Sequence, residues 1–194
     1  MRLLASLTLC LLFLFSPFTG WANLDPALQG KKAENFIKKL GQEAIDVLEK
    51  SNDDEEIVRR EFKRILNKNF DMTTLARFAM GRYWTIATDA EKKEYTKLFN
   101  KMVVDVYSKR FSDYSGQDFE VIGNKPAGRK DFVVNSIIKG AGSPVKVGWR
   151  LRKGKVIDVI VAGVSMSVTQ RSEFASVIQR NGGQVSALVE HLKK

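Results

Sequence analysis

The spacing of apolar positions changes twice along this 194-residue chain. From about residue 26 to residue 111, apolar residues recur every three or four positions, the period of helices that bury one face. From residue 119 to residue 161 they alternate with polar residues or form short β-branched runs, as strands do. The helical period returns after residue 165. We therefore predict an α+β protein, with helices packed on one face of a curved antiparallel sheet of about four strands.

Four helices are predicted before the sheet, because each apolar stripe follows a residue or group that favours a helix start. An Asp-Pro pair suits the cap and first position, and acidic residues complement the positive end of a helix dipole. The predicted starts are, in order, Asp25-Pro26, residues 53–56, Asp71 and the capping box Thr88–Glu91. Gly81 ends the third helix, and the fourth ends near Phe111.

The predicted strands are joined by short turns. They cover residues 119–122, 132–138, 145–151 and 156–161. Glycine-containing stretches at 140–143 and 153–154 read as hairpin turns, so neighbouring strands should be antiparallel. In the third strand Val147 and Trp149 should face inward, while Lys146 and Arg150 face solvent.

The last predicted strand leads directly into a helix. Ala162-Gly163 interrupts the apolar run, and helical spacing begins within a few residues, with Phe174 and Ile178 on one face. We expect a positive φ or close backbone packing at Gly163, because glycine adopts angles that other residues avoid. A final short helix follows the Gly182-Gly183 pair.

The first 22 residues have the pattern of a secretory signal peptide. They contain one positive charge, an apolar core from Leu3 to Phe15 and a small-residue cleavage pattern ending at Ala22. The core is too short to remain as a membrane-spanning anchor. Cleavage would remove Cys10, the only cysteine. We expect residues 23–194 to form a single exported domain held together by its core.

The formal net charge of +10 predicts an anionic partner. An exported protein rarely meets nucleic acid, and the sequence has no aromatic-rich basic RNA-binding motif, so we expect an anionic lipid surface or an acidic protein. A basic stripe on the second helix, opposite its apolar side, is either a docking surface or an ordinary solvated face. It comprises Arg60, Lys63, Arg64 and Lys68.

Little catalytic apparatus is visible in the sequence. His191 is the only histidine and Cys10 the only cysteine, which excludes Ser-His and Cys-His nucleophilic systems and a histidine or thiolate zinc site. No phosphate-binding glycine loop is present, and we expect no cofactor and no metal. Asp158, within an apolar strand, could act as a base if it faced a dry pocket, but strand alternation also allows it to face solvent or Arg150.

Several motifs, in their order and spacing, resemble one family. The strongest is D-x-x-x-x-G-V-S-M followed by T-Q-R-x-E-F, within residues 158–174. The others are Asn69-Phe70-Asp71-Met72, Met80-Gly81-Arg82-Tyr83-Trp84, Tyr107 with Tyr114-Ser115-Gly116, and Pro144-Val145-Lys146-Val147. Together they resemble the MlaC-type periplasmic phospholipid-binding proteins of the Mla (maintenance of lipid asymmetry) system, also labelled toluene-tolerance or ABC-transporter auxiliary proteins. Gly154-Lys155-Val156 departs from the tryptophan that many members carry there, so the pocket edge should differ.

The resemblance implies a cone related to nuclear transport factor 2, with additional N-terminal helices, that encloses an apolar cavity for phospholipid acyl chains. It implies a periplasmic, monomeric carrier without enzymatic activity. The carrier would exchange lipid with an outer-membrane lipoprotein complex and an inner-membrane ABC transporter bearing an MCE-domain protein, and would touch anionic membrane surfaces transiently. On this basis the expected lipid-binding residues are Phe78, Trp84, Leu98, Phe99, Met102, Val103, Val106, Tyr107, Val134, Val147, Trp149, Ile160, Val164 and Met166.

Three alternatives remain open at this point. A hopanoid-type lipid could be the ligand, as some relatives are associated with hopanoid biosynthesis. A cone-fold enzyme could act on a small apolar molecule with Asp158 as its base. A lipid-free adaptor could dock through its basic stripe. An apolar stripe at helical spacing is more often solid core than ligand pocket, so the sequence pattern alone does not establish a cavity.

Overall fold

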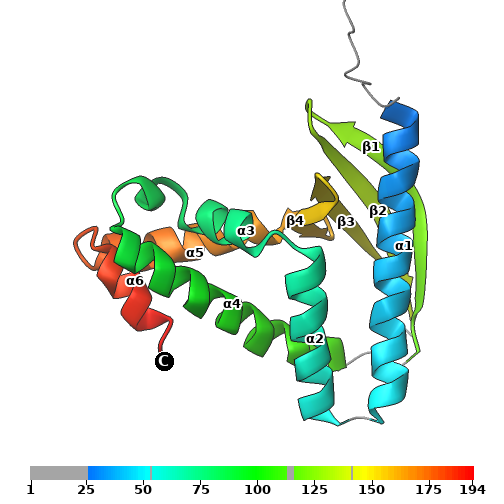
Figure 1. The fold of residues 1–194 in the computed structure, drawn as a ribbon, viewed down its shortest axis with the longest axis horizontal. Helices are drawn as coiled ribbons and strands as arrows, with labels where there is room; N and C mark the ends of the chain where they lie inside the picture. Colours follow the sequence, from blue (N-terminus) through cyan, green and yellow to red (C-terminus); the bar gives the residue numbers. More distant parts are fainter. Residues whose placement is uncertain (1–25, 53, 113–115, 141) are drawn as a thin grey trace, which may run out of the picture.

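The computed structural model describes residues 26–52, 54–112, 116–140 and 142–194, and Figure 1 shows their arrangement. Along the chain, helices come first, the strands of a sheet follow, and two more helices end the chain, as the changes in apolar spacing predicted. The helices are α1 (Pro26–Ser51), α2 (Glu55–Asn69), α3 (Met72–Met80), the 3-10 turn η1 (Gly81–Thr85), α4 (Asp89–Ser112), α5 (Met166–Arg180) and α6 (Val185–His191). The strands are β1 (Asp118–Ala127), β2 (Asp131–Lys139), β3 (Val145–Arg152), β4 (Lys155–Val161) and β5 (Val164–Ser165).

The sheet is an antiparallel meander in the order β1-β2-β3-β4-β5. The predicted α+β class and curved antiparallel sheet are therefore confirmed. The strand count is five, because the two-residue β5 folds back on β4 through Ile160 and Val161. Register shifts interrupt the β1–β2 ladder near Gly123 and the β3–β4 ladder near Leu151. Such bulges increase the local bend and twist of a sheet.

Side-chain caps begin α2, α3 and α4 at the predicted places, and the predicted cap of the first helix, Asp25, lies outside the described residues. Asp71 Oδ1 accepts the backbone N–H of Thr74 at 2.9 Å and so caps α3. Before α4, the backbone N–H of Glu91 donates to Thr88 Oγ1 at 3.2 Å, while Glu91 Oε2 accepts the N–H of Thr88 at 2.8 Å. This reciprocal pair is the predicted capping box. The cap of α2 is Asp54, within the acidic stretch that predicted its start.

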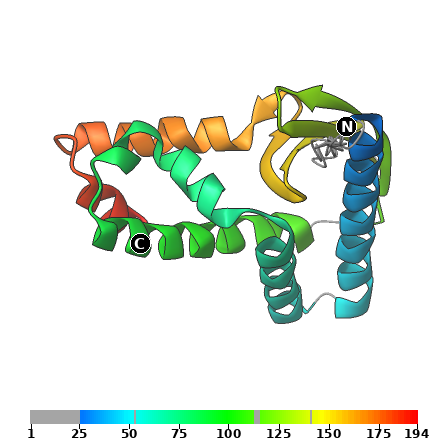
Figure 2. The same ribbon diagram turned by 45° about the horizontal axis from the view of Figure 1, so that its top comes forward.

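Two apolar clusters form the core, and they occupy different parts of the molecule. One lies among α3, η1, α4, α5 and α6, which extend away from the sheet (Figure 2), and is centred on Tyr95, Met80 and Ile178. The other lies between α1, α2 and the sheet and contains Ile37, Val134 and Val156. The partly buried Phe70 links the two clusters, because it packs against both.

Helix α1 lies close to the sheet beside β1 (Figure 1). Gly41 makes this approach possible, because a Cβ at this position would collide with the ring of Phe119. Phe119 in turn stacks edge-on against Trp149, with the ring centroids 6.4 Å apart. The helix and the sheet therefore meet through one glycine and two aromatic rings.

The chain leaves the sheet at a sharp corner after β4. Gly163 has φ +85° and Ala162 has φ 49°, so both occupy the left-handed region. The expectation of a positive φ at Gly163 is confirmed. The turn folds β5 onto β4 and delivers the chain into α5, whose N-cap is Ser165.

Within the described ranges, no helix is both long and apolar enough to cross a membrane. The segment predicted to be a signal peptide, residues 1–22, lies outside them.

Candidate functional site

A cavity of about 620 Å³ lies between the sheet and the helices. Both core clusters contribute to its wall: Leu40 and Ile65 come from the sheet-side cluster, and Ala79 and Phe99 from the helical one. The lining residues are Leu40, Gly41, Ala44, Ile45, Leu48, Phe62, Ile65, Leu66, Phe70, Leu75, Ala79, Phe99, Val103, Tyr107, Gln117, Phe119, Ile138, Trp149, Val159, Val161, Met166, Ser167 and Gln170. The cavity thus occupies the place where the two clusters would otherwise merge.

Many of these apolar side chains remain partly accessible although they face the interior of the fold. Ala44 and Leu48 on α1, Val103 on α4, and Val159 on β4 are all only partly buried. In a close-packed protein interior such side chains would fill the space between them. The space between sheet and helices is therefore open, and it is bounded by hydrocarbon.

Among the residues that the structure describes, none that lines the cavity is charged. Its polar groups belong to Tyr107, Gln117, Ser167 and Gln170, all from neighbouring helices or the segment before β1. No group of three or more histidine, cysteine or acidic residues able to hold a metal occurs in the described part of the chain. A wall of this kind favours apolar ligands, because it offers hydrophobic contact and no partner for a buried charge.

Five of the fourteen predicted lipid-binding residues line the cavity. They are Phe99, Val103, Tyr107, Trp149 and Met166.

The other nine predicted residues do not line the cavity, and they lie in three different kinds of place. Trp84, Leu98 and Met102 pack against the helical core cluster. Phe78, Val106 and Val164 are exposed, with 43%, 43% and 57% of their surfaces accessible. Val134 and Val147 are buried in the sheet without reaching the cavity, and Ile160 faces the opposite side of the sheet from its neighbours Val159 and Val161.

The α1 wall of the cavity was not among the predicted site residues. Leu40, Ala44, Ile45 and Leu48 all face it from this helix, as does Phe62 from α2. The helical period did place Leu40, Ala44 and Leu48 on one face. That signal identifies an inward face, but the same period would arise if the face were packed solid.

Asp158 does not line the cavity and instead holds the β4–α5 corner together. Its Oδ2 accepts the hydroxyl of Ser165 at 2.6 Å, and its Oδ1 accepts the backbone N–H of Ser167 at 3.1 Å and of Val159 at 2.9 Å. Arg150, the partner that strand alternation suggested, pairs instead with Asp131. The carboxylate of Asp158 is thus engaged in local structural contacts on the side of the strand away from the cavity.

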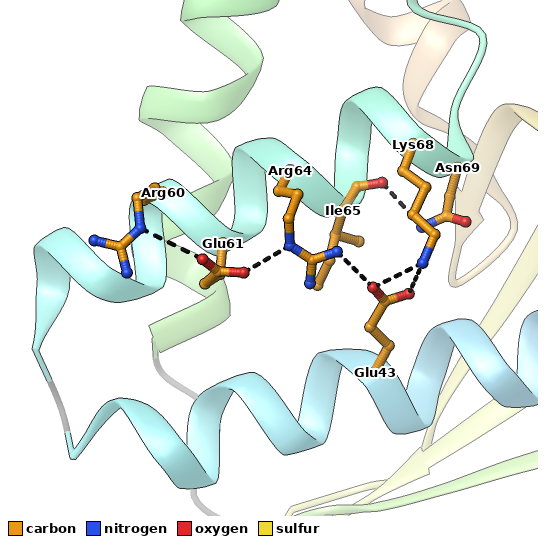
Figure 3. A network of polar contacts seen from close by, with 7 residues as sticks. All are labelled: Glu43, Arg60, Glu61, Arg64, Ile65, Lys68 and Asn69. Carbon is orange, nitrogen blue, oxygen red and sulfur yellow. Dashed lines mark hydrogen bonds and ion pairs between the residues drawn. The ribbon is translucent and has the colours of Figure 1, made fainter.

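The basic stripe on α2 is divided by its contacts. Figure 3 shows Arg64 and Lys68 paired with Glu43 of α1, at 2.8 and 3.1 Å, and Arg60 and Arg64 paired with Glu61. The hydrogen bond from Arg64, and then that from Lys68, lowers the pKa of Glu43. Three of the four predicted docking residues therefore already have carboxylate partners within the chain. Lys63 is different, because it lines a separate groove between α2 and α4.

The fold and the cavity define a class of protein in which helices and a curved antiparallel sheet enclose an apolar chamber, whose described lining residues are uncharged. A sequence model of the family described as MlaC protein matches residues 38–194. The chain therefore belongs to the MlaC family.

Two of the known proteins to which this chain is similar illustrate the relationship. The intermembrane phospholipid transport system binding protein MlaC of Haemophilus influenzae is 24% identical over 112 residues, 53% of this chain and 52% of the relative. The chain thus matches about half the length of this curated relative. The phospholipid-binding protein of Ralstonia solanacearum, solved in complex with a phospholipid, has a TM-score of 0.76 and 24% sequence identity, with 83% of this chain and 94% of that chain covered. At this identity the likeness establishes a shared fold.

Proposed function

We propose that this protein is a periplasmic phospholipid carrier that holds acyl chains in the cavity between its sheet and its helices. The observation that carries the proposal is the apolar cavity of about 620 Å³, whose described lining residues are all uncharged. The headgroup would stay outside, because the described part of the lining has no charge to pair with a phosphate.

Membership of the MlaC family supports the ligand class. The Haemophilus influenzae relative is named as a phospholipid transport binding protein, and the Ralstonia solanacearum neighbour was solved with a phospholipid bound. The signal-peptide pattern of residues 1–22 supports export to the periplasm. We propose that the carrier exchanges lipid with an inner-membrane ABC transporter bearing an MCE-domain protein and with an outer-membrane lipoprotein complex.

The energetics of acyl chains explain how such a carrier works without catalytic residues. Removing roughly thirty methylenes from water yields about 24 kcal/mol at ~0.8 kcal/mol each. Spontaneous escape of the lipid into water is therefore negligible. A bilayer offers much the same apolar environment as the cavity, so the free-energy difference for exchange with a membrane is small. The direction of transport must then come from the partners.

Filling the cavity tests the proposal directly. Val103→Phe combined with Val159→Phe places two rings into the space from opposite walls, α4 and β4. We expect the double variant to melt no lower than lipid-stripped wild type, because the rings occupy ligand space. It should also purify with much less phospholipid, measured by native mass spectrometry and by organic extraction that identifies the lipid released.

Two matched variants control for bulk alone. Val106→Phe adds the same ring to α4 at an exposed position and should leave the lipid content unchanged. Val147→Phe adds it at a buried sheet position outside the cavity, where overpacking should cost about 1–3 kcal/mol of stability. Wild-type protein that carries no lipid under gentle purification would contradict the carrier function. If the extract contains a hopanoid instead of a phospholipid, the proposed carrier function stands and the proposed ligand class changes to hopanoids.

A further inference from the structure

A second hollow, separate from the apolar cavity, runs between α2 and α4. It encloses about 880 Å³ and is lined by Arg59, Lys63, Asn67, Trp84, Lys92, Lys93, Thr96, Lys97, Asn100, Lys101 and Val104. Along α4 the lining extends from Lys92 to Val104, about 18 Å at the helical rise of 1.5 Å per residue. We call this hollow the α2–α4 groove.

Positive charge dominates the groove. Six of its described lining side chains are cationic, and none of them is acidic. Within the described part of the chain, two carboxylates pair with these cations: Asp105 pairs with Arg59 and Lys101, and Asp89 pairs with Lys92. Among the described residues, Lys63, Lys93 and Lys97 have no ion-pair partner in the chain. The groove therefore presents unbalanced charge to a ligand.

The spacing of these cations destabilises the helices that carry them. Lys93, Lys97 and Lys101 follow one another at intervals of four on α4, as do Arg59 and Lys63 on α2. Like charges at this spacing repel and destabilise a helix. The opposite side of α2 shows the contrast, because Arg64 and Lys68 there are balanced by Glu43 (Figure 3). On α2, the charges of Arg64 and Lys68 are thus neutralised by α1, whereas Lys63 on the groove side is left without an ion-pair partner among the described residues.

The rest of the lining suits a polypeptide. Trp84, which is partly accessible, provides an aromatic surface, with Lys92 Nζ 5.9 Å from its ring centroid. Asn100 Nδ2 donates to Asn67 Oδ1 at 2.9 Å, which brings two side-chain amides together between the helices. Amides can hydrogen bond to a peptide backbone, and tryptophan is enriched at protein–protein hot spots.

We propose that the α2–α4 groove is the docking site for an acidic segment of a partner protein. A concave channel bounded by two helices can surround a chain of carboxylates, whereas a flat bilayer surface would reach only its rim. The length of the groove matches about six extended residues. The proposal rests on the groove alone and holds whichever lipid the apolar cavity carries.

A fluorescein-labelled peptide of about six glutamates serves as the probe, with binding followed by fluorescence anisotropy at low and physiological salt. Lys93→Glu with Lys97→Glu should weaken binding by about tenfold or more, because the reversed charges face the probe. It should also reduce the salt dependence of binding. Lys63→Glu alone, on the other wall, should weaken binding in the same direction, since the site includes both helices.

The matched control is Lys125→Glu with Lys130→Glu, which makes the same change in net charge at exposed positions on β1 and in the turn after it. Its binding should stay within about twofold of wild type. Circular dichroism and melting temperature verify that each variant is folded. Lipid content should be unchanged in all of them, which separates a failure of docking from a failure of the carrier function.

Three results would overturn the proposal. The first is equal peptide binding by the groove variants and wild type. The second is an equal loss of binding in the control, which would reduce the effect to net charge. The third is that wild type does not bind the peptide but binds phosphatidylglycerol vesicles, and that the groove variants lose this vesicle binding. That result would assign the groove to a membrane surface.

Discussion

At the scale of single residues, the corner after β4 depends on backbone angles that most side chains avoid. Ala162 and Gly163 have φ values of 49° and +85°. Apart from Gly163 and its two chain neighbours, no residue has an atom within 4 Å of the place where a Cβ on Gly163 would stand. A side chain at this position would therefore meet no steric obstacle from its surroundings. The cost of substitution comes from the backbone alone.

Gly163→Val should consequently lower the free energy of unfolding by about 1 kcal/mol or more, because β-branched residues tolerate positive φ poorly. Thermal melting measures the loss. Gly163→Asn is the matched comparison and should cost less, since asparagine occupies the left-handed region more readily. If both variants melt like wild type, backbone strain at this corner is not what requires glycine.

At the scale of elements, β2 and β3 are joined by a buried carboxylate as well as by their ladder. Asp131 is only 3% exposed, and it accepts hydrogen bonds from Arg152 Nε at 2.6 Å and Arg150 Nε at 2.8 Å. The hydrogen bond from Arg152, and then that from Arg150, lowers the pKa of Asp131 despite its burial. The ionised form is thus preferentially stabilised in the folded state.

This lowered pKa predicts a pH dependence with a definite sign. A carboxyl whose pKa falls on folding contributes stability above its unfolded pKa of about 3.9, and this contribution is lost as pH drops through the lower folded value. Asp131→Asn should therefore cost about 2 kcal/mol near neutral pH, as expected for hydrogen bonds to a charged group. The difference between variant and wild type should shrink as the pH falls below about 4.

Denaturant unfolding at a series of pH values measures this difference. Glu120→Gln is the control, because Glu120 pairs with Lys139 at the surface, where 55% and 49% of the two side chains are exposed. That change should have little effect at any pH. A constant gap between Asp131→Asn and wild type from neutral pH to strong acid would show that the Asp131 charge does not stabilise the fold.

At the scale of the whole molecule, the cavity separates two cores that would otherwise be continuous. The helical cluster and the sheet-side cluster both contribute to its wall. A ligand in this position contacts both and supplies the apolar contacts that the empty interior lacks. The stability of the protein should therefore depend on whether the cavity is occupied.

Removal of the lipid should lower the melting temperature of the wild type. A ligand present at about one hundred times its dissociation constant adds about 2.7 kcal/mol, which corresponds to roughly 5–10 °C for a chain of this size. Calorimetry of loaded and solvent-stripped protein measures the shift. In Val103→Phe/Val159→Phe the two preparations should melt together, since the rings replace the ligand. A stripped wild type that melts at the same temperature as the loaded protein would contradict this coupling.

The elements of this fold could be predicted from the sequence because local physics determines them. Helix starts follow from caps such as Asp71 and Thr88, whose side chains bond to backbone groups three residues away. The β-branched run before Gly163 and the alternation in β3 likewise require only neighbouring residues. The short β5 was missed, because two residues carry no period and their pairing depends on the turn at 162–163.

The site was decided by tertiary structure. Five of the predicted lipid-binding residues reach the cavity, while Val106 and Ile160, equally apolar, face solvent or the other side of the sheet. Sequence period specifies which face of an element is apolar, but not whether that face meets another side chain or an empty space. Likewise, the basic residues of α2 form one stripe in the sequence. Only the packing of α1 on one side and α4 on the other makes Lys68 a balanced charge and Lys63 a free one.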